Sequence, residues 1–132
     1  MNSQELKENL QFLNENEKLE YIIQLGKELL PIKEKKEKNK IRGCTSNAYI
    51  KLIKENNQLT IQGDADSIIV KGYIKIIQIL TDKKTKEYLQ NQLEKDILNL
   101  IKETKLDINM LPSRANAFSN MIQHIKKQAE KL

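Results

Sequence analysis

Apolar residues recur at helical spacing in the first part of the chain. Over residues 14–30 they stand three or four positions apart. These apolar positions are Leu19, Ile22, Ile23, Leu25, Leu29 and Leu30. Asn14 suits the N-cap, and Glu17 follows at the third position, as in a capping box. The pattern predicts an amphipathic helix that ends before Pro31, followed by a charged, exposed loop over residues 31–40.

The hydrophobic period then changes from helical spacing to alternation. Residues 46–55 and 58–64 alternate β-branched or aromatic residues with polar ones. Asn56 and Asn57 stand between the two segments, and asparagine is common in tight turns. The alternation predicts an antiparallel hairpin.

The second half of the chain reads as several helices. Residues 67–80 contain so many Ile and Val residues that helix and strand compete, but the run is longer than a usual strand and favours a helix with Asp66 as its N-cap. A further helical stretch is predicted around residues 86–104. A final helix is predicted to begin near Ser113, and its apolar positions are Leu111, Ala115, Phe118, Met121, Ile122 and Ile125.

These elements predict the α+β class, with one helix, a small antiparallel sheet and then several helices. A length of 132 residues fits one ordinary domain, 1–132, that can bury a continuous core. No apolar run approaches the roughly 18 residues that a spanning helix needs, and the polar start MNSQELKENL does not resemble a secretory signal. We therefore expect a cytoplasmic protein without a membrane partner.

The net positive charge of the chain does not by itself indicate a nucleic-acid partner. The net charge is +5, but the lysines are scattered among acids, as in KEKKEKNK. The four Tyr and two Phe residues do not interleave with a basic run, as single-strand binders require. A solvated charged surface is favoured over a nucleic-acid partner.

The segment KIRGCTSNAYI contains the single cysteine of the chain, Cys44. A thiol reacts as its thiolate, which nearby positive charge and amide donors stabilise. Arg42 supplies a charge, Gly43 allows a sharp backbone turn, and Thr45 and Ser46 are small polar residues that suit such a loop. A free cysteine is also often a small buried apolar residue, so the local sequence leaves both interpretations open.

The numbers of Cys and His residues and the absence of certain motifs argue against several other kinds of site. Structural zinc and iron–sulfur clusters need several Cys or His ligands, and this chain has Cys44 and His124 alone. A catalytic Cys/His pair is conceivable, but His124 lies within the final amphipathic segment, which favours a structural role. The chain has no second thiol for thioredoxin-type chemistry and no nucleotide-binding glycine motif.

Four segments of the chain resemble one protein family, in its order and at about its separations. They are EYIIQLGKELLP, IRGCTSNAYI, IQGDADSIIVKG and LPSRANAF. The chain resembles the SufE family, the sulfur-acceptor proteins that work with a pyridoxal-phosphate cysteine desulfurase in iron–sulfur cluster assembly. The resemblance implies a compact α+β fold with a curved antiparallel sheet of about three strands covered by helices, similar to the iron–sulfur scaffold fold.

The resemblance also implies a site and its partners. Cys44 would accept persulfide sulfur from a SufS-like cysteine desulfurase, stimulate that enzyme and pass the sulfur to a SufBCD-like scaffold complex. Asp66 and Arg114 match the family's acid and late arginine and, with the residues around Cys44, become candidates for loop or partner contacts. The chain would need no cofactor or metal, because the pyridoxal phosphate belongs to the desulfurase. A non-catalytic binding module that regulates a partner is the alternative.

Overall fold

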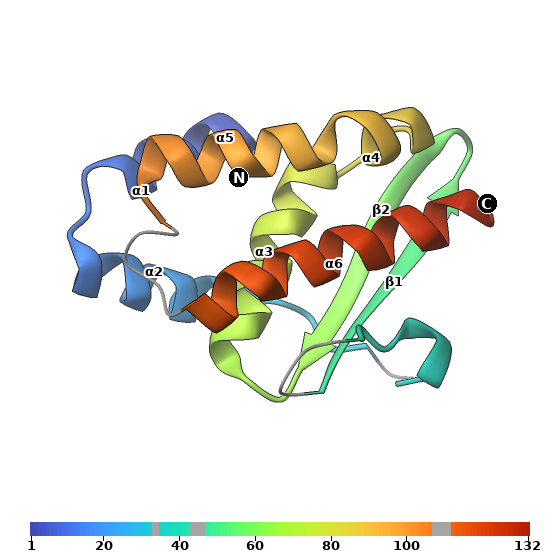
Figure 1. Ribbon diagram of the computed structural model, residues 1–132, viewed down its shortest axis with the longest axis horizontal. Coiled ribbons are helices and arrows are strands. Elements are labelled where there is room, and N and C mark those ends of the chain that lie inside the picture. The colour runs from blue at the N-terminus through green and yellow to red at the C-terminus, as the bar shows by residue number, and fades with distance from the viewer. Residues whose placement is uncertain (33–34, 43–46, 107–111) are drawn as a thin grey trace.

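The computed structural model describes residues 1–32, 35–42, 47–106 and 112–132, with residues 112–117 described by their backbone alone. The chain forms helices around one β-hairpin, and the predicted α+β class is confirmed (Figure 1). Its helices are α1 (Ser3–Gln11), α2 (Glu15–Glu28), α3 (Ile68–Thr81), α4 (Lys86–Asn91), α5 (Leu93–Thr104) and α6 (Pro112–Glu130), with a short 3-10 helix, η1 (Glu37–Asn39). The strands are β1 (Ala48–Glu55) and β2 (Gln58–Ala65).

The predicted first long helix is confirmed as α2, together with its capping box. The side chain of Asn14 accepts a hydrogen bond from Glu17 N, and the Glu17 carboxylate accepts one from Asn14 N, each at 2.9 Å. The helix ends at Glu28, so Leu30 lies beyond it and is 82% exposed. Leu30 therefore does not belong to the apolar face on which it was counted.

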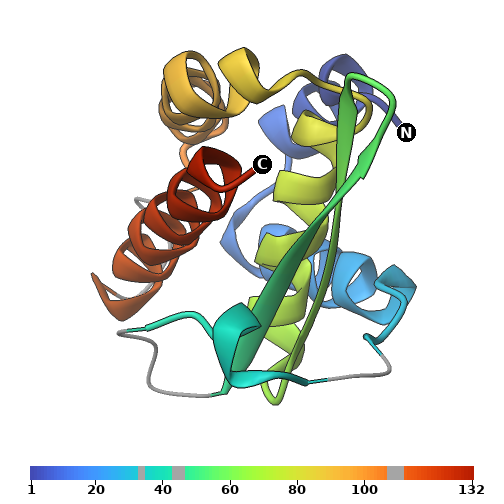
Figure 2. The same ribbon diagram turned by 90° about the vertical axis from the view of Figure 1, so that its right-hand side faces the viewer.

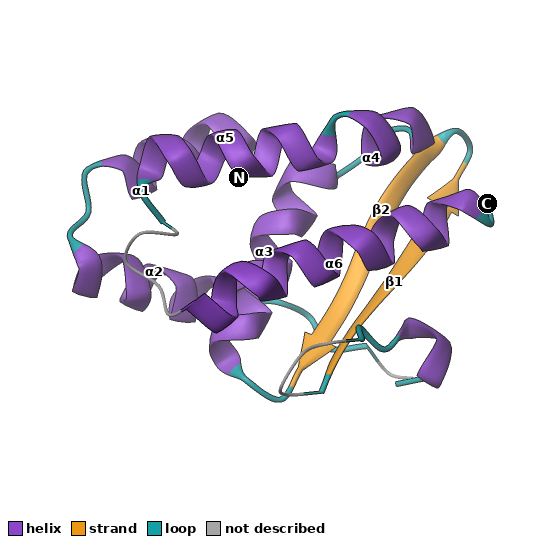
Figure 3. Ribbon diagram, viewed as in Figure 1, coloured by secondary structure: helices purple, strands orange, loops and turns teal. Residues whose placement is uncertain are grey.

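The predicted hairpin is also confirmed, with Asn56 in the left-handed conformation at its turn (φ 58°). The register pairs Leu52 with Ile61, and both side chains are buried. The sheet has two strands, whereas about three were predicted. The chain at Lys40 pairs with β1 through a single bridge to Tyr49, which does not amount to a third strand. Figure 3 shows the two strands running side by side behind α6.

Two glutamine side chains from helices and one backbone bond from the turn after α3 satisfy part of the outer edges of this hairpin. On β2, Leu59 N donates to Lys84 O at 2.7 Å, and the side-chain amide of Gln78 donates to Ile61 O at 3.0 Å. On β1, Leu52 N donates to the side-chain oxygen of Gln128 at 3.1 Å. Each glutamine supplies the kind of amide group that a neighbouring strand would otherwise offer.

Helices α2 and α3 cross closely because glycine stands on both sides of the contact. An added Cβ at Gly26 would lie 2.3 Å from Ile68 O, and one at Gly72 would lie 2.2 Å from Ile22 O. The absence of these side chains lets the two backbones touch and buries Ile22 completely. Helix α3 packs against β2 on one part of the sheet, while α6 packs against β1 (Figure 2).

Other parts of the helical prediction need correction. The predicted stretch 86–104 is two helices that meet at Gln92, where the backbone leaves helical geometry (φ −121°, ψ −30°). Helix α1 is absent from the prediction because its sequence is mostly polar; Leu6 and Leu10, one turn apart, bury its inner face. The predicted exposed loop 31–40 contains η1 and buries Asn39.

One cluster of buried apolar side chains joins the helices and the hairpin. Tyr73 of α3 meets Phe118 of α6 with ring centroids 4.5 Å apart and planes tilted by 49°. The predicted apolar positions Phe118, Met121, Ile122 and Ile125 are buried, whereas Leu111 and Ala115 lie outside the described side chains. Of the helices in the described ranges, none is both long enough and apolar enough to span a bilayer.

Candidate functional site

The cysteine itself lies outside the described residues, as do Gly43, Thr45 and Ser46. We call residues 43–46 the Cys44 segment. The structure describes the residues that hold its two ends, and these are the evidence for how the site is built. The roles predicted for the four residues stay predictions.

The two ends of the Cys44 segment are held together by backbone pairing. Ile41 N donates to Ala48 O at 2.8 Å, and Lys40 forms an antiparallel bridge with Tyr49. Arg42, the last described residue before the segment, is exposed. The thiol therefore belongs to a short connection whose ends are fixed at the edge of β1.

A third contact fixes the exit of the segment to the start of α3. Asp66 N donates to Asn47 O at 3.0 Å. The N-cap of α3 is Ser67, whose hydroxyl accepts from Val70 N at 3.4 Å, so the prediction of Asp66 as the cap is wrong. Strand pairing continues to Ala65 and leaves Asp66 in the connection, with an exposed side chain and a backbone that positions the exit of the segment.

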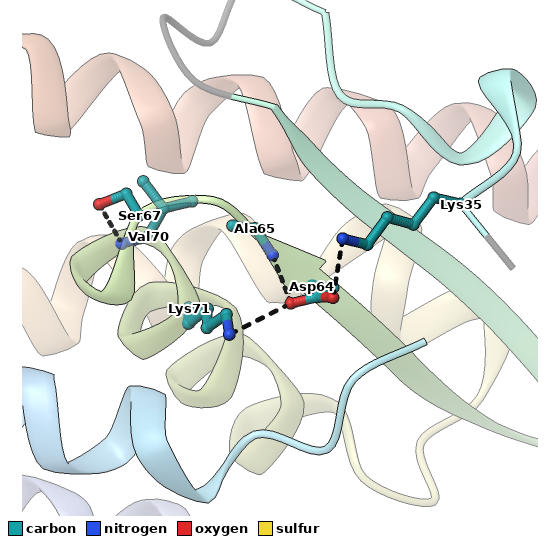
Figure 4. A network of polar contacts seen from close by, with 6 residues as sticks. All are labelled: Lys35, Asp64, Ala65, Ser67, Val70 and Lys71. Carbon is teal, nitrogen blue, oxygen red and sulfur yellow. Dashed lines mark hydrogen bonds and ion pairs between the residues drawn. The ribbon is translucent and has the colours of Figure 1, made fainter. Parts of the chain in front are cut away.

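A buried carboxylate that the sequence interpretation missed lies beside these ends. Asp64 is 5% exposed, and one of its oxygens accepts from Ala65 N at 2.8 Å (Figure 4). Lys71 Nζ of α3 approaches this oxygen to 3.5 Å, and Lys35 Nζ approaches the other oxygen to 3.4 Å. Asp64 thus links the chain before η1, the end of β2 and the first turns of α3.

The alternating pattern does not reveal Asp64 as a buried residue. Gly63, Asp64 and Ala65 are all buried in succession, so alternation ends where β2 is covered on both faces. The available signal was the first acid in the GDAD sequence, Asp64, which lies shortly before a long apolar helix and needs cationic partners if it is buried.

Helix α6 reaches the same edge of β1 through Gln128. Its amide nitrogen donates to Ile50 O at 3.0 Å and to the Asn39 side-chain oxygen at 3.2 Å. Together with the bond from Leu52 N, these contacts fasten α6 to β1 and to η1. The Gln128 side chain occupies the edge of β1 at Ile50 and Leu52. The chain around Lys40 therefore pairs with β1 through one bridge, at Tyr49, and does not continue along the strand.

His124 has the structural position that the sequence analysis favours. Its Nε2 lies 2.9 Å from Ile50 O, which requires the Nε2–H tautomer for a hydrogen bond. Partial burial lowers the pKa of His124, the bond to Ile50 O opposes this change, and the charges of Lys127 and Lys131 lower the pKa further. A neutral imidazole that donates to the strand fits both this bond and the direction of the pKa change.

Arg114 falls in the first turn of α6, but its side chain is not among those described. The predicted contact of Arg114 with the Cys44 segment or with a partner remains a prediction. In the described ranges there is no group of three or more His, Cys, Asp or Glu side chains placed to hold a metal ion.

Comparison with known proteins identifies relatives over nearly the whole chain. Residues 4–129 match the family model described as "SufE: Fe-S metabolism associated domain". The chain is 40% identical over 120 residues to the cysteine desulfuration protein SufE of Wigglesworthia glossinidia brevipalpis, covering 88% of this chain and 81% of that protein. The solution structure of a hypothetical protein from Thermus thermophilus superposes with a TM-score of 0.77 over 97% of this chain and 93% of the other. At 11% identity that likeness concerns the fold alone. The match of the family model and the identity to a named member place this chain in the SufE family.

Proposed function

We propose that this protein accepts sulfane sulfur onto Cys44 from the persulfide of a cysteine desulfurase and delivers it for iron–sulfur cluster assembly. The single observation that carries the proposal is the family match over residues 4–129 of a chain with one cysteine. The printed name of the relative from Wigglesworthia, a cysteine desulfuration protein, supports the same role.

The chemistry needs one thiol from this chain. The thiolate of Cys44 attacks the outer sulfur of the partner's cysteine persulfide and forms a new sulfur–sulfur bond. The original sulfur–sulfur bond breaks, and the partner's cysteine leaves as a thiolate. Cys44 then carries the persulfide, and because one sulfur–sulfur bond replaces another, no external oxidant or reductant is consumed.

The surroundings of the Cys44 segment favour this reaction. Arg42 places an exposed positive charge two residues before the cysteine, and positive charge stabilises a thiolate. The pairing of Ile41 with Ala48 and of Asn47 with Asp66 holds both ends of the segment at fixed positions. A thiol presented from fixed ends reaches a partner's persulfide at a smaller entropic cost than one in a free chain.

Two further consequences follow for the partner proteins. Removal of sulfur frees the desulfurase nucleophile for another cysteine, so this protein stimulates turnover. The persulfide on Cys44 then passes to a scaffold complex of the SufBCD type. The pyridoxal phosphate is held by the desulfurase.

The test measures alanine formation from cysteine by the desulfurase alone, with this protein and with its Cys44→Ser variant. Stimulation by the wild-type chain and its loss in the variant are expected. Mass spectrometry after incubation with the desulfurase and cysteine provides the direct readout, a mass increase of one sulfur on wild-type protein alone. Equal stimulation by both forms would identify a regulatory binding module, and sulfur uptake by Cys44→Ser would refute the assignment of Cys44.

A further inference from the structure

A cleft of about 380 Å³ lies between the second half of α6 and the chain from η1 to Arg42. Cations from two distant parts of the sequence line this basic cleft: Lys38, Lys40 and Arg42 on one side, and Lys127 and Lys131 on the other. The lining within the described residues includes one acid, Glu37. The packing of α6 against β1 thus gathers positive charge that is scattered along the chain.

The cations of the basic cleft differ from other lysines in their partners. Lys7, Lys35, Lys71 and Lys126 each lie within 4 Å of a carboxylate oxygen. Among the carboxylates that the structure describes, none lies that close to a lysine or arginine of the cleft. Their charge is available to attract an anionic surface, since no carboxylate in the described part of the chain lies within ion-pair distance of it.

His124 reports the same positive potential from within the cleft. It lines the cleft, and its pKa is lowered by burial and also by Lys127 and Lys131, against the opposing bond to Ile50 O. The charges of these two lysines are therefore close enough to act on another residue that lines the cleft.

The geometry favours carboxylates distributed over a protein surface instead of one compact phosphate. Lys127 lies in the last turn of α6, where the helix presents carbonyl groups and a partial negative charge. Phosphate sites usually form at the opposite helix end, where backbone N–H groups point outward. Four of the five cations are lysines, which act as separate point charges on flexible stems and suit several spaced acids.

The position of the basic cleft identifies the partner. Arg42 lines the cleft and is also the residue that leads directly into the Cys44 segment, so a protein that binds the cleft contacts the chain where that segment begins. We infer that the basic cleft is a docking surface for an acidic patch on the desulfurase, which steers the enzyme's persulfide toward Cys44. This inference rests on the proposed function, because it names the partner of the same site.

The test is a pair of charge-reversal variants that change net charge equally. The cleft variant carries Lys127→Glu and Lys131→Glu. The control carries Lys95→Glu and Lys102→Glu, two exposed lysines of α5 outside the cleft. Association and dissociation rate constants with the desulfurase are measured for each at low and high ionic strength, and circular dichroism verifies that both variants are folded.

Steering predicts a lower association rate constant for the cleft variant, by about tenfold or more at low salt, with little change in dissociation. The difference should shrink at high salt, because screening removes long-range attraction. The control should stay within about twofold of the wild-type chain. Equal association by the cleft variant and the control would overturn the inference, since net charge and not the cleft would then be responsible.

Two further measurements separate this inference from the proposed function. The Cys44→Ser variant should associate at the wild-type rate and take up no sulfur. Unchanged association of the cleft variant together with sulfur uptake that depends on Cys44 would refute the cleft and leave the function intact. Titration with a labelled DNA oligonucleotide tests whether the basic cleft binds nucleic acid instead. If the cleft variant loses DNA binding while its association with the desulfurase is unchanged, the inference of a protein partner is refuted.

Discussion

Replacement of Asp64 offers a quantitative test of how the Cys44 segment is supported. Asp64→Asn retains the size of the side chain and an oxygen that accepts from Ala65 N, but removes the charge that faces Lys35 and Lys71. The lysine side chains are 47% and 30% exposed, so solvent screens both pairs. With N···O distances of 3.4 and 3.5 Å, we expect the two pairs together to stabilise the fold by about 1–2 kcal/mol.

Asp64→Ala removes more than the charge. The acceptor of Ala65 N is lost at a buried position, which costs about a further 1–3 kcal/mol. The free energy of unfolding should therefore fall in the order wild type, Asp64→Asn, Asp64→Ala. Denaturant unfolding measures this order, and an unchanged m-value would show that unfolding exposes the same surface in each variant.

Asp66→Asn is the matched control, because Asp66 is exposed and two residues away. Its free energy of unfolding should stay within about 0.5 kcal/mol of the wild-type value. Hydrogen exchange gives the local readout: in Asp64→Asn, Ile41 N–H should exchange faster, since the chain that Lys35 ties to Asp64 leads to this bond. Unchanged stability and unchanged exchange at Ile41 would refute the proposed link.

Three other predictions concern single contacts. Because burial lowers the pKa of His124, the unfolded chain binds protons more readily, so stability should fall as pH decreases through about 6.5, and His124→Asn should flatten this dependence in pH-resolved unfolding. Gly72→Ala places a Cβ 2.2 Å from the backbone oxygen of Ile22 and should destabilise the fold by about 3 kcal/mol, seen as a lower Tm, whereas an unchanged Tm would contradict the close crossing. Ser67→Ala should cost about 0.5–1 kcal/mol and Ser67→Asp much less, because aspartate retains the cap; equal losses would contradict the cap.

Local sequence signals predicted the elements whose causes are local. Asn14 and Glu17 form the capping box at the expected spacing, and Asn56 forms the hairpin turn. The choice between Asp66 and Ser67 as N-cap was not local, because both residues can cap a helix. Strand pairing determines which of the two caps α3. Strand β2 continues to Ala65, and the backbone N–H of Asp66 donates to Asn47 O, so the helix begins after Ser67.

The candidate site likewise has one part that local sequence predicts and another that depends on long-range packing. Its single thiol was identified from the sequence by counting and resemblance. Asp64 was missed because its burial and its partners depend on distant parts of the chain: Lys35 reaches it from before η1 and Lys71 from α3 (Figure 4). The basic cleft was missed because Lys38 and Lys127 are far apart in sequence and come together through the contacts of Gln128. Long-range packing of this kind leaves no periodic signal in a single sequence.

The closure of both hairpin edges bears on how the protein behaves at high concentration. A bare strand edge offers a row of unpaired amides to which another chain can add a strand, the first step of many aggregation reactions. Here Gln78 occupies the edge of β2 and Gln128 the edge of β1, while Lys40 and Lys84 each contribute one backbone bridge. A second copy would have to displace an amide side chain and a backbone bridge to join either strand. A sheet of two strands can therefore remain small without recruiting further strands from its neighbours.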